Sequence, residues 1–293
     1  MSESAPAAEV ECPPPIVRGV EVWRPADGGL LRLGDESPSD PGTAVNQAVS
    51  TRLPAIESGG DGPPMVAIPA FEKDELRGVV SLLLDEVEDG QGAVELWRPN
   101  ERGELARGDA WYSGLERFGL VSGYVKFPRR AGLPGKVWAD RFPRVMGDLA
   151  KSSDFVRVAG AKAEGLSMAL GVPFMKTALE IDAVLLLLSA SSSPLARVME
   201  VWAPDPETGD LKVVSADYGP YVDLAPMSRR RRVKPGECLA GRVFADRAPW
   251  MTTDLLGVEF PCGARLGEYG FGWGVGLPVI VAGELFAVVT LLA

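Results

Sequence analysis

Histidine is absent from this chain of 293 residues. Its absence removes the commonest general base, the catalytic triads and dyads built on histidine, and the commonest transition-metal ligand. Three cysteines are present, Cys12, Cys238 and Cys262, but they form no CxxC pair of the kind that predicts zinc. Any reaction must therefore rest on Asp, Glu, Lys, Tyr or Cys, and we expect no metal site.

Aromatic side chains gather in the last third of the sequence and give the best candidate for a binding site. Phe271 and Trp273 stand two residues apart, so both would point to one face of a strand. There they would either line a pocket under a helical segment or fill it. The residues that we expect to contact a ligand are Phe244, Trp250, Cys262, Tyr269, Phe271 and Trp273.

Three phrases recur in the same order along the chain, which predicts three copies of one module. The first phrase is Val22-Trp23-Arg24-Pro25, Leu96-Trp97-Arg98-Pro99 and Val201-Trp202-Ala203-Pro204. The second phrase runs through 135–143 and 241–249, and a less similar copy lies at 46–54. The third is Ile68-Pro69, Val172-Pro173 and Leu277-Pro278. We expect the tryptophans to be packing anchors, and the Asp-Arg pairs of the second phrase to form a structural turn or a salt bridge.

Each repeat is predicted to contain two strands, a helical middle and two further strands, an α+β module on an antiparallel sheet. The expected organisation is a disordered leader at 1–15, an abbreviated module at 16–88, and fuller modules at 89–192 and 193–293. The abbreviated module has too short a middle to enclose a pocket. In the fuller modules we expect helices at 153–165 and 262–269.

The order of phrases resembles the GAF domain. The resemblance is carried in the third module by 234–244, by Thr253-Asp254-Leu255 and by 274–289, and in the second by 133–138, 147–149 and 171–174. It implies an antiparallel sheet and the sensing of a small molecule, such as a cyclic nucleotide, a bilin, haem or a metabolite. Bilin and haem sites of this family normally use a histidine, so the sequence names no cofactor.

The resemblance leaves three functions open. The favoured one is a non-catalytic small-molecule sensor or protein-interaction module. The second is a structural assembly protein whose pockets are filled, and the third is a redox enzyme using Cys238 and Cys262, since some family members reduce methionine sulfoxide. The chain departs from the family in having no room for the usual helices that flank the sheet.

The last strands of each module are apolar at nearly every position, which predicts burial on both faces. Without flanking helices, the exposed faces must cover one another within the chain or between subunits, giving self-association or contact with a protein partner.

Composition narrows the remaining partners. The net charge of −10 disfavours nucleic acids and anionic membranes, and we interpret Arg229 to Arg232 as a solvated loop. The longest apolar run, 183–188, is too short to span a bilayer, and the N-terminus lacks a secretory signal. We therefore expect a cytoplasmic protein.

Overall fold

Three similar groups of strands and helices follow one another along the chain. The computed structural model describes residues 14–58, 62–85, 91–255 and 263–293, so most of the expected leader lies outside the described residues. Module 1 contains β1 (Val17–Ala26), β2 (Gly29–Arg32), α1 (Thr43–Thr51), β3 (Ala55–Glu57), β4 (Met65–Glu72) and β5 (Glu75–Leu84). Module 2 contains β6 (Gly92–Pro99), β7 (Leu105–Ser113), α2 (Glu116–Tyr124), β8 (Lys126–Phe127), α3 (Gly132–Asp140), β9 (Arg144–Met146), α4 (Val158–Ala163), β10 (Leu166–Met175) and β11 (Ile181–Ala190). Module 3 contains β12 (Val198–Pro204), β13 (Leu211–Asp217), α5 (Leu224–Arg230), α6 (Cys238–Asp246), β14 (Trp250–Thr252), α7 (Gly263–Glu268), β15 (Gly274–Val281) and β16 (Glu284–Leu292).

Each module forms one antiparallel sheet with the same strand order. The orders are β2-β1-β5-β4-β3, β8-β7-β6-β11-β10-β9 and β13-β12-β16-β15-β14. In every case the opening strand lies between its hairpin partner and the last strand of the module, so the opening and closing hairpins meet in the middle of the sheet. The prediction of a repeated α+β module on an antiparallel sheet is confirmed.

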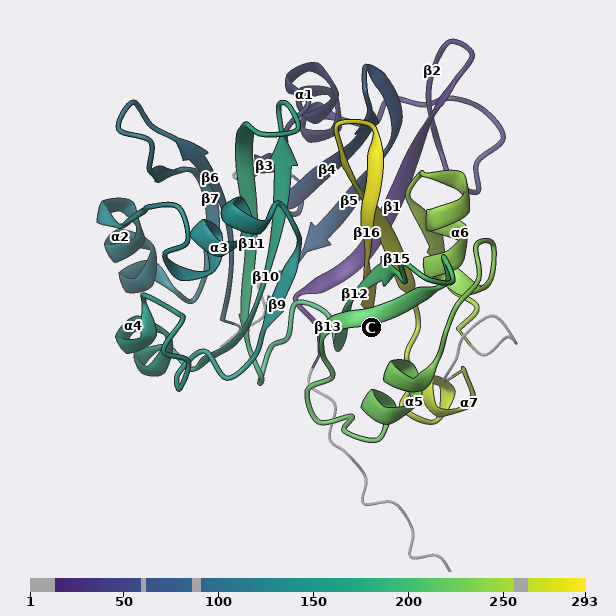
Figure 1. Cartoon of the computed structure of the whole chain (residues 1–293). Helices are drawn as coiled ribbons and strands as arrows, with labels where there is room; N and C mark the ends of the chain where they lie inside the picture. The colour runs from purple at the N-terminus through teal and green to yellow at the C-terminus, as the bar shows by residue number, and fades with distance from the viewer. Residues whose placement is uncertain (1–13, 59–61, 86–90, 256–262) are drawn as a thin grey trace, which may run out of the picture.

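The three sheets pack against one another inside the chain. One face of each sheet contributes to a single apolar cluster, to which module 1 gives Val80 and Leu82, module 2 gives Leu170 and Leu187, and module 3 gives Leu277 and Val289. Figure 1 shows helices α2–α4 and α5–α7 on opposite outer sides, with the strands between them. Of the two expected ways to cover these faces, within the chain or between subunits, the structure shows the first, because each sheet covers its neighbours. Self-association stays a prediction.

The opposite face of each sheet is covered by helices of its own module. Trp23, Trp97 and Trp202 lie on this outer face in three separate clusters. They are 5%, 0% and 2% exposed, as expected for packing anchors. In module 1 the cluster lies under α1, whereas modules 2 and 3 place three helices each around theirs.

The repeated arginine of the second phrase is explained by a contact common to all modules. Arg52, Arg141 and Arg247 end α1, α3 and α6 in the left-handed conformation, with φ of 62°, 54° and 52°. Each guanidinium then donates to a backbone carbonyl in the closing hairpin of its own module; the acceptors are Lys73, Ala178 and Gly283. The expected structural turn is present, and it attaches the helix to the hairpin.

Several helices differ from the sequence expectation. The predicted helix at 153–165 is reduced to α4, because the backbone N–H of Asp154 bonds to the Ser152 hydroxyl and the chain forms turns before Val158. The segment expected at 262–269 forms α7, over Gly263–Glu268, and Cys262 lies outside the described residues. Helices α2 and α5 were not expected; α5 includes Arg229 and Arg230, which we had assigned to a loop.

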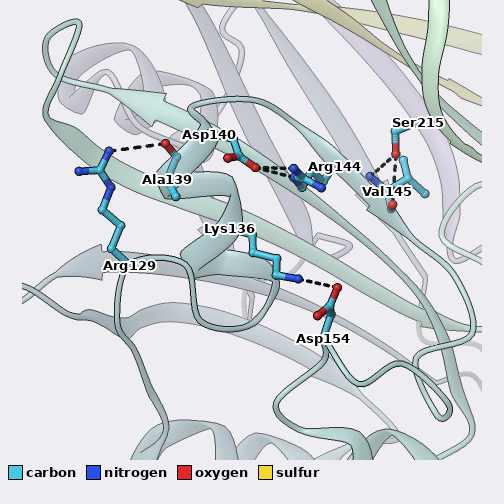
Figure 2. A network of polar contacts seen from close by, with 8 residues as sticks. All are labelled: Arg129, Lys136, Ala139, Asp140, Arg144, Val145, Asp154 and Ser215. Atoms are coloured by element: carbon cyan, nitrogen blue, oxygen red, sulfur yellow. Dashed lines mark hydrogen bonds and ion pairs between the residues drawn. The ribbon is translucent and has the colours of Figure 1, made fainter.

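Polar contacts join the modules at the rims of the shared core. The Ser215 hydroxyl of β13 accepts from the backbone N–H of Val145 at 3.0 Å and donates to its carbonyl at 3.1 Å (Figure 2). Figure 2 also shows Lys136 of α3 paired with Asp154 at 2.5 Å, close to this edge of module 2. Modules 1 and 3 are joined by an ion pair of Arg247 with Glu72 at 3.0 Å. No helix in the described ranges has both the length and the apolar character to cross a membrane.

Candidate functional site

A glutamate stands two residues before the repeated tryptophan in every module. The pairs are Glu21 and Trp23, Glu95 and Trp97, and Glu200 and Trp202. Residues two apart on a strand share a face, so the opening strand carries each carboxylate to the outer face that its helices cover. Since an ionised carboxylate is costly to bury without partners, the surroundings of these glutamates decide what each module can do.

Module 2 buries its glutamate with an arginine. In the described part of module 2, Trp97 Nε1 donates to Glu95 Oε2 at 3.0 Å, and the Tyr112 hydroxyl donates to Oε1 at 2.7 Å. Arg157 Nη1 also donates to Oε1 at 2.7 Å and to the Ser122 hydroxyl at 2.5 Å. The two charged side chains are 0% and 3% exposed, so the ion pair is sealed from solvent.

Aromatic rings complete the surroundings of this arginine. The Arg157 guanidinium carbon lies 4.5 Å from the ring centre of Phe118 and 5.4 to 5.7 Å from those of Trp97, Phe155 and Phe127. Rings at these distances stabilise a cation through their negative faces. Burial alone would raise the pKa of Glu95, but the charge and hydrogen bond of Arg157 bring it below its usual value. Module 2 therefore holds a permanent cation beside its carboxylate.

Module 3 repeats the polar partners but not the arginine. Trp202 Nε1 donates to Glu200 Oε2 at 3.0 Å and the Tyr218 hydroxyl donates to Oε1 at 2.9 Å. Thr290 lies directly across from Glu200 on β16, and its hydroxyl donates to Oε2 at 3.2 Å. A hydrogen bond from Ser228 of α5 completes the set. At the position of Thr290, module 2 has Leu186 opposite its glutamate.

Glu200 has no cationic partner in the described part of the chain. Its side chain is buried, with an exposure of 5%. In module 2 the arginine precedes α4; the corresponding helix of module 3 is α7, whose Arg265 forms ion pairs with Asp223 and Glu268 instead. The residues outside the described ranges contain no lysine or arginine. Burial raises the pKa of Glu200, and hydrogen bonds from its four neighbours offset only part of that effect.

A cavity lies beside Glu200 where module 2 has its arginine. The space open to the centres of water molecules is about 20 Å³, enough for one water-sized group. Its polar lining is Glu200, Trp202, Tyr218, Ser228, Thr290 and the thiol of Cys238, and the remaining residues of the lining are aliphatic. Cys238 begins α6 with a φ of 45°, where module 2 has Gly132 with a φ of 60°. A non-glycine residue in this region is strained, as is common at ligand sites.

Module 1 keeps its glutamate at the surface. Glu21 is 22% exposed at the side chain and pairs with Arg32 of β2 at 3.1 Å. Trp23 Nε1 finds no hydrogen-bond partner among the described residues. The carboxylate, which is buried in modules 2 and 3, is solvated here, in the module that has a single helix.

Five of the six residues proposed from the sequence are described by the structure, and none of the five lines the cavity of module 3. Phe244, Trp250, Tyr269 and Phe271 pack with the outer-face core of module 3, whereas Trp273 packs with the shared core on the opposite side. Both Phe271 and Trp273 precede β15, which starts at Gly274, so they do not stand on one face of a strand. The expectation of ligand contact at these residues stays a prediction, and Cys262 lies outside the described residues.

Sequence reasoning missed Glu200 and its four polar partners. The signal was present, since a Glu-x-Trp pair recurs in each module and a tyrosine follows the glutamate after 17 residues in module 2 and 18 in module 3. A glutamate on the same face as a buried tryptophan is itself an indication of an enclosed carboxylate. Among the described residues, no group of His, Cys, Asp and Glu side chains is arranged to hold a metal ion.

A wider opening lies where the three closing hairpins meet. It measures about 400 Å³, and the third phrase of each module lines it through Pro69, Pro173 and Pro278. Figure 1 shows the turns of these hairpins together at one end of the molecule. The charged groups at its rim, among them Lys73 and Lys176, are exposed, so this opening follows from the way the modules pack and lacks the buried polar set of module 3.

Comparisons with known proteins find similar solved structures at low sequence identity. No protein-family model matches the chain. No curated protein matches it. Similar solved structures include the GAF domain of A. aeolicus nlh2 in an inactive state (20% identity, 34% of this chain and 58% of that one, TM-score 0.26). They also include the GAF domain/HD domain protein of Geobacter sulfurreducens (14%, 35% and 65%, TM-score 0.30) and Staphylococcus aureus NreA mutated in its nitrate-binding site (19%, 36% and 77%, TM-score 0.28).

The three modules share one strand order, and the second and third carry the phrases by which the sequence resembles GAF domains. Each alignment covers about a third of the chain, the length of one GAF-like module, and less than two thirds of the first two structures. In this chain the second face of each sheet is buried against the other two sheets.

Proposed function

We propose that the chain is a non-catalytic sensor in which module 3 binds a small polar molecule and modules 1 and 2 form its scaffold. The observation that carries this proposal is the cavity beside Glu200, where a buried carboxylate, an indole N–H and three hydroxyls converge. Small-molecule sites in proteins are enclosed, mostly apolar spaces with a few converging polar groups. Modules 1 and 2 offer no such arrangement, because Glu21 is solvated and Glu95 already holds Arg157.

The two alternatives from the sequence are weaker. A purely structural role is favoured by the shared core of the three sheets but leaves the uncompensated burial of Glu200 without a purpose. A redox role for Cys238 is disfavoured, because burial raises the pKa of its thiol and the thiolate is the reactive form.

Transmission of the signal is part of the same proposal. Helices α5 and α6 cover the cavity, and the exposed Val222 and Met227 lie on or next to α5. A ligand that orders these helices would change the surface around Val222 and Met227. We therefore propose that a protein partner binds this surface and responds to the change. We further propose that the protein acts in the cytoplasm.

Release of a retained molecule tests ligand binding. The purified protein is denatured and the released small molecules are measured by mass spectrometry, alongside a thermal-shift screen of metabolites. The matched control is Thr290→Leu, which gives module 3 the aliphatic residue that module 2 has and fills part of the cavity. Binding that disappears in this variant supports the proposal; no ligand from either method, or equal binding by the variant, contradicts it.

A further inference from the structure

We propose that the cavity of module 3 takes the primary ammonium group of a small organic cation, held by the carboxylate of Glu200. This inference rests on the proposed function and names the chemical class of its ligand. It is carried by the comparison between two modules of the same chain and by the size and lining of the cavity.

Module 2 shows what charge this arrangement accommodates. A tryptophan and a tyrosine donate to Glu95, as their counterparts do to Glu200. The Arg157 guanidinium bonds to both Glu95 and the Ser122 hydroxyl. This arginine is the residue before α4. In module 3 the carboxylate, indole and tyrosine hydroxyl are retained and no basic residue of the described chain pairs with Glu200. A site that keeps the carboxylate and leaves the cation's place open is suited to a cation from solution.

The size and acceptors of the cavity favour an ammonium over a larger cation. About 20 Å³ admits one water-sized group, whereas a guanidinium is several times larger. An ammonium has three N–H donors and no acceptor. Glu200 and the hydroxyl oxygens of Tyr218, Ser228 and Thr290 line the cavity, and each of these oxygens can accept a hydrogen bond. The ring of Trp202 supplies an aromatic wall, which also favours positive charge.

Binding of this kind must strengthen with pH. An ammonium binds the ionised form of Glu200, and burial holds the pKa of that carboxyl above its usual value. The other titratable groups at the cavity are Tyr218 of β13 and Cys238 of α6, which feel the charges of Arg229 and Arg231. Burial raises the pKa of both, so they stay neutral between pH 5.5 and 8 while an alkylammonium stays charged. Only Glu200 then changes charge at the site.

The test is a titration of the full chain with methylammonium, read from the indole N–H resonances in a nitrogen-15 NMR spectrum at constant ionic strength. Trp202, which bonds to Glu200, is the reporter, and Trp97, which bonds to the already paired Glu95, is the internal control. We expect a saturable shift of Trp202 with a millimolar dissociation constant, the tightest that a ligand of two non-hydrogen atoms reaches. The affinity should rise with pH as Glu200 loses its proton, and the Trp97 resonance should not move.

Two control compounds are titrated at the same concentrations. Methanol has the size of methylammonium but no charge, and guanidinium has the charge but a larger size. The variant Glu200→Gln keeps the shape of the side chain and removes its charge. The inference is supported when methylammonium shifts Trp202 more strongly than either compound and the shift is lost in Glu200→Gln with Trp97 unchanged. It is overturned by an equal response to methanol or by a response that survives in Glu200→Gln. If the metabolite screen finds a neutral or anionic ligand in module 3, the proposed function stands and this inference fails; if nothing binds module 3, both fail.

Discussion

Modules 2 and 3 bury the same glutamate on the same strand but stabilise it in different ways. Glu95 is compensated by the full charge of Arg157 inside four aromatic rings, whereas Glu200 has hydroxyl and indole donors and a small cavity. The fold therefore tolerates a carboxylate under its helices in either form. Module 2 supplies a countercharge from its own chain, whereas no basic residue in the described part of the chain pairs with Glu200.

The largest effect is expected from removing the internal cation of module 2. Arg157→Met leaves Glu95 buried and unpaired, which costs about 3–5 kcal/mol of unfolding free energy. Denaturant unfolding at pH 7 measures the loss. The matched control is Arg32→Met in module 1, which breaks exposed pairs with Glu21 and Asp35 and should change the unfolding free energy little. If the two variants lost the same unfolding free energy, burial of the ion pair in module 2 would not increase its contribution to stability.

The two glutamates should make the unfolding free energy depend on pH in opposite directions, and we expect these effects to be of intermediate size. The pKa of Glu200 is raised by burial, so the folded state binds more protons and stability falls as pH rises above about 4.5 and through the folded pKa. The pKa of Glu95 is lowered by Arg157 in spite of burial, so its contribution is present above about 4.5 and is lost as pH falls through the folded pKa. Each unit of separation between folded and unfolded pKa corresponds to about 1.4 kcal/mol.

Unfolding curves of Glu200→Gln from pH 4 to 8 check this sign. The amide keeps the shape of the side chain without the charge, so the variant should gain stability relative to the natural chain as pH rises. Glu95→Gln should instead lose stability relative to the natural chain, because it leaves Arg157 buried without its partner. A gain for both variants, or a pH-independent difference for Glu200→Gln, would contradict the assignment of these environments.

The repeats made the architecture of this chain predictable, because three phrases in one order require three similar sheets. The mutual covering of the sheets also followed from strands such as β11 and β16, whose residues are apolar on both faces. The cavity beside Glu200 was not predicted, since the sequence analysis followed aromatic residues such as Phe271 and Trp273 while the polar partners of Glu200 come from distant elements. Tyr218, Ser228 and Thr290 reach Glu200 from a strand, a helix and the last strand, and only the fold brings them together.

The absence of a countercharge could not be read from the sequence for a related reason. Arg157 and Arg265 both lie near the helix that precedes the closing strands, yet the first points inward to Glu95 and the second outward to Asp223. Their directions depend on turns of a few residues, and these are the least regular part of each module. Local sequence therefore specified that a basic residue was present but not which way it faced.

The smallest effect concerns the contact that connects the two modules under comparison. Ser215 stands on β13, three residues before Tyr218, and its hydroxyl bonds both backbone groups of Val145 at the edge of module 2 (Figure 2). Ser215→Ala should cost about 1 kcal/mol, because the edge of β9 is partly accessible and water replaces part of the lost bonding. The control is Ser153→Ala, at an exposed position, which should change the unfolding free energy little.

Hydrogen exchange at the Val145 amide measures the effect locally. Faster exchange there, with the methylammonium response of Trp202 intact, would show that module 3 binds without this link. If the response is lost as well, the cavity depends on the edge of module 2, and the two modules act as one unit.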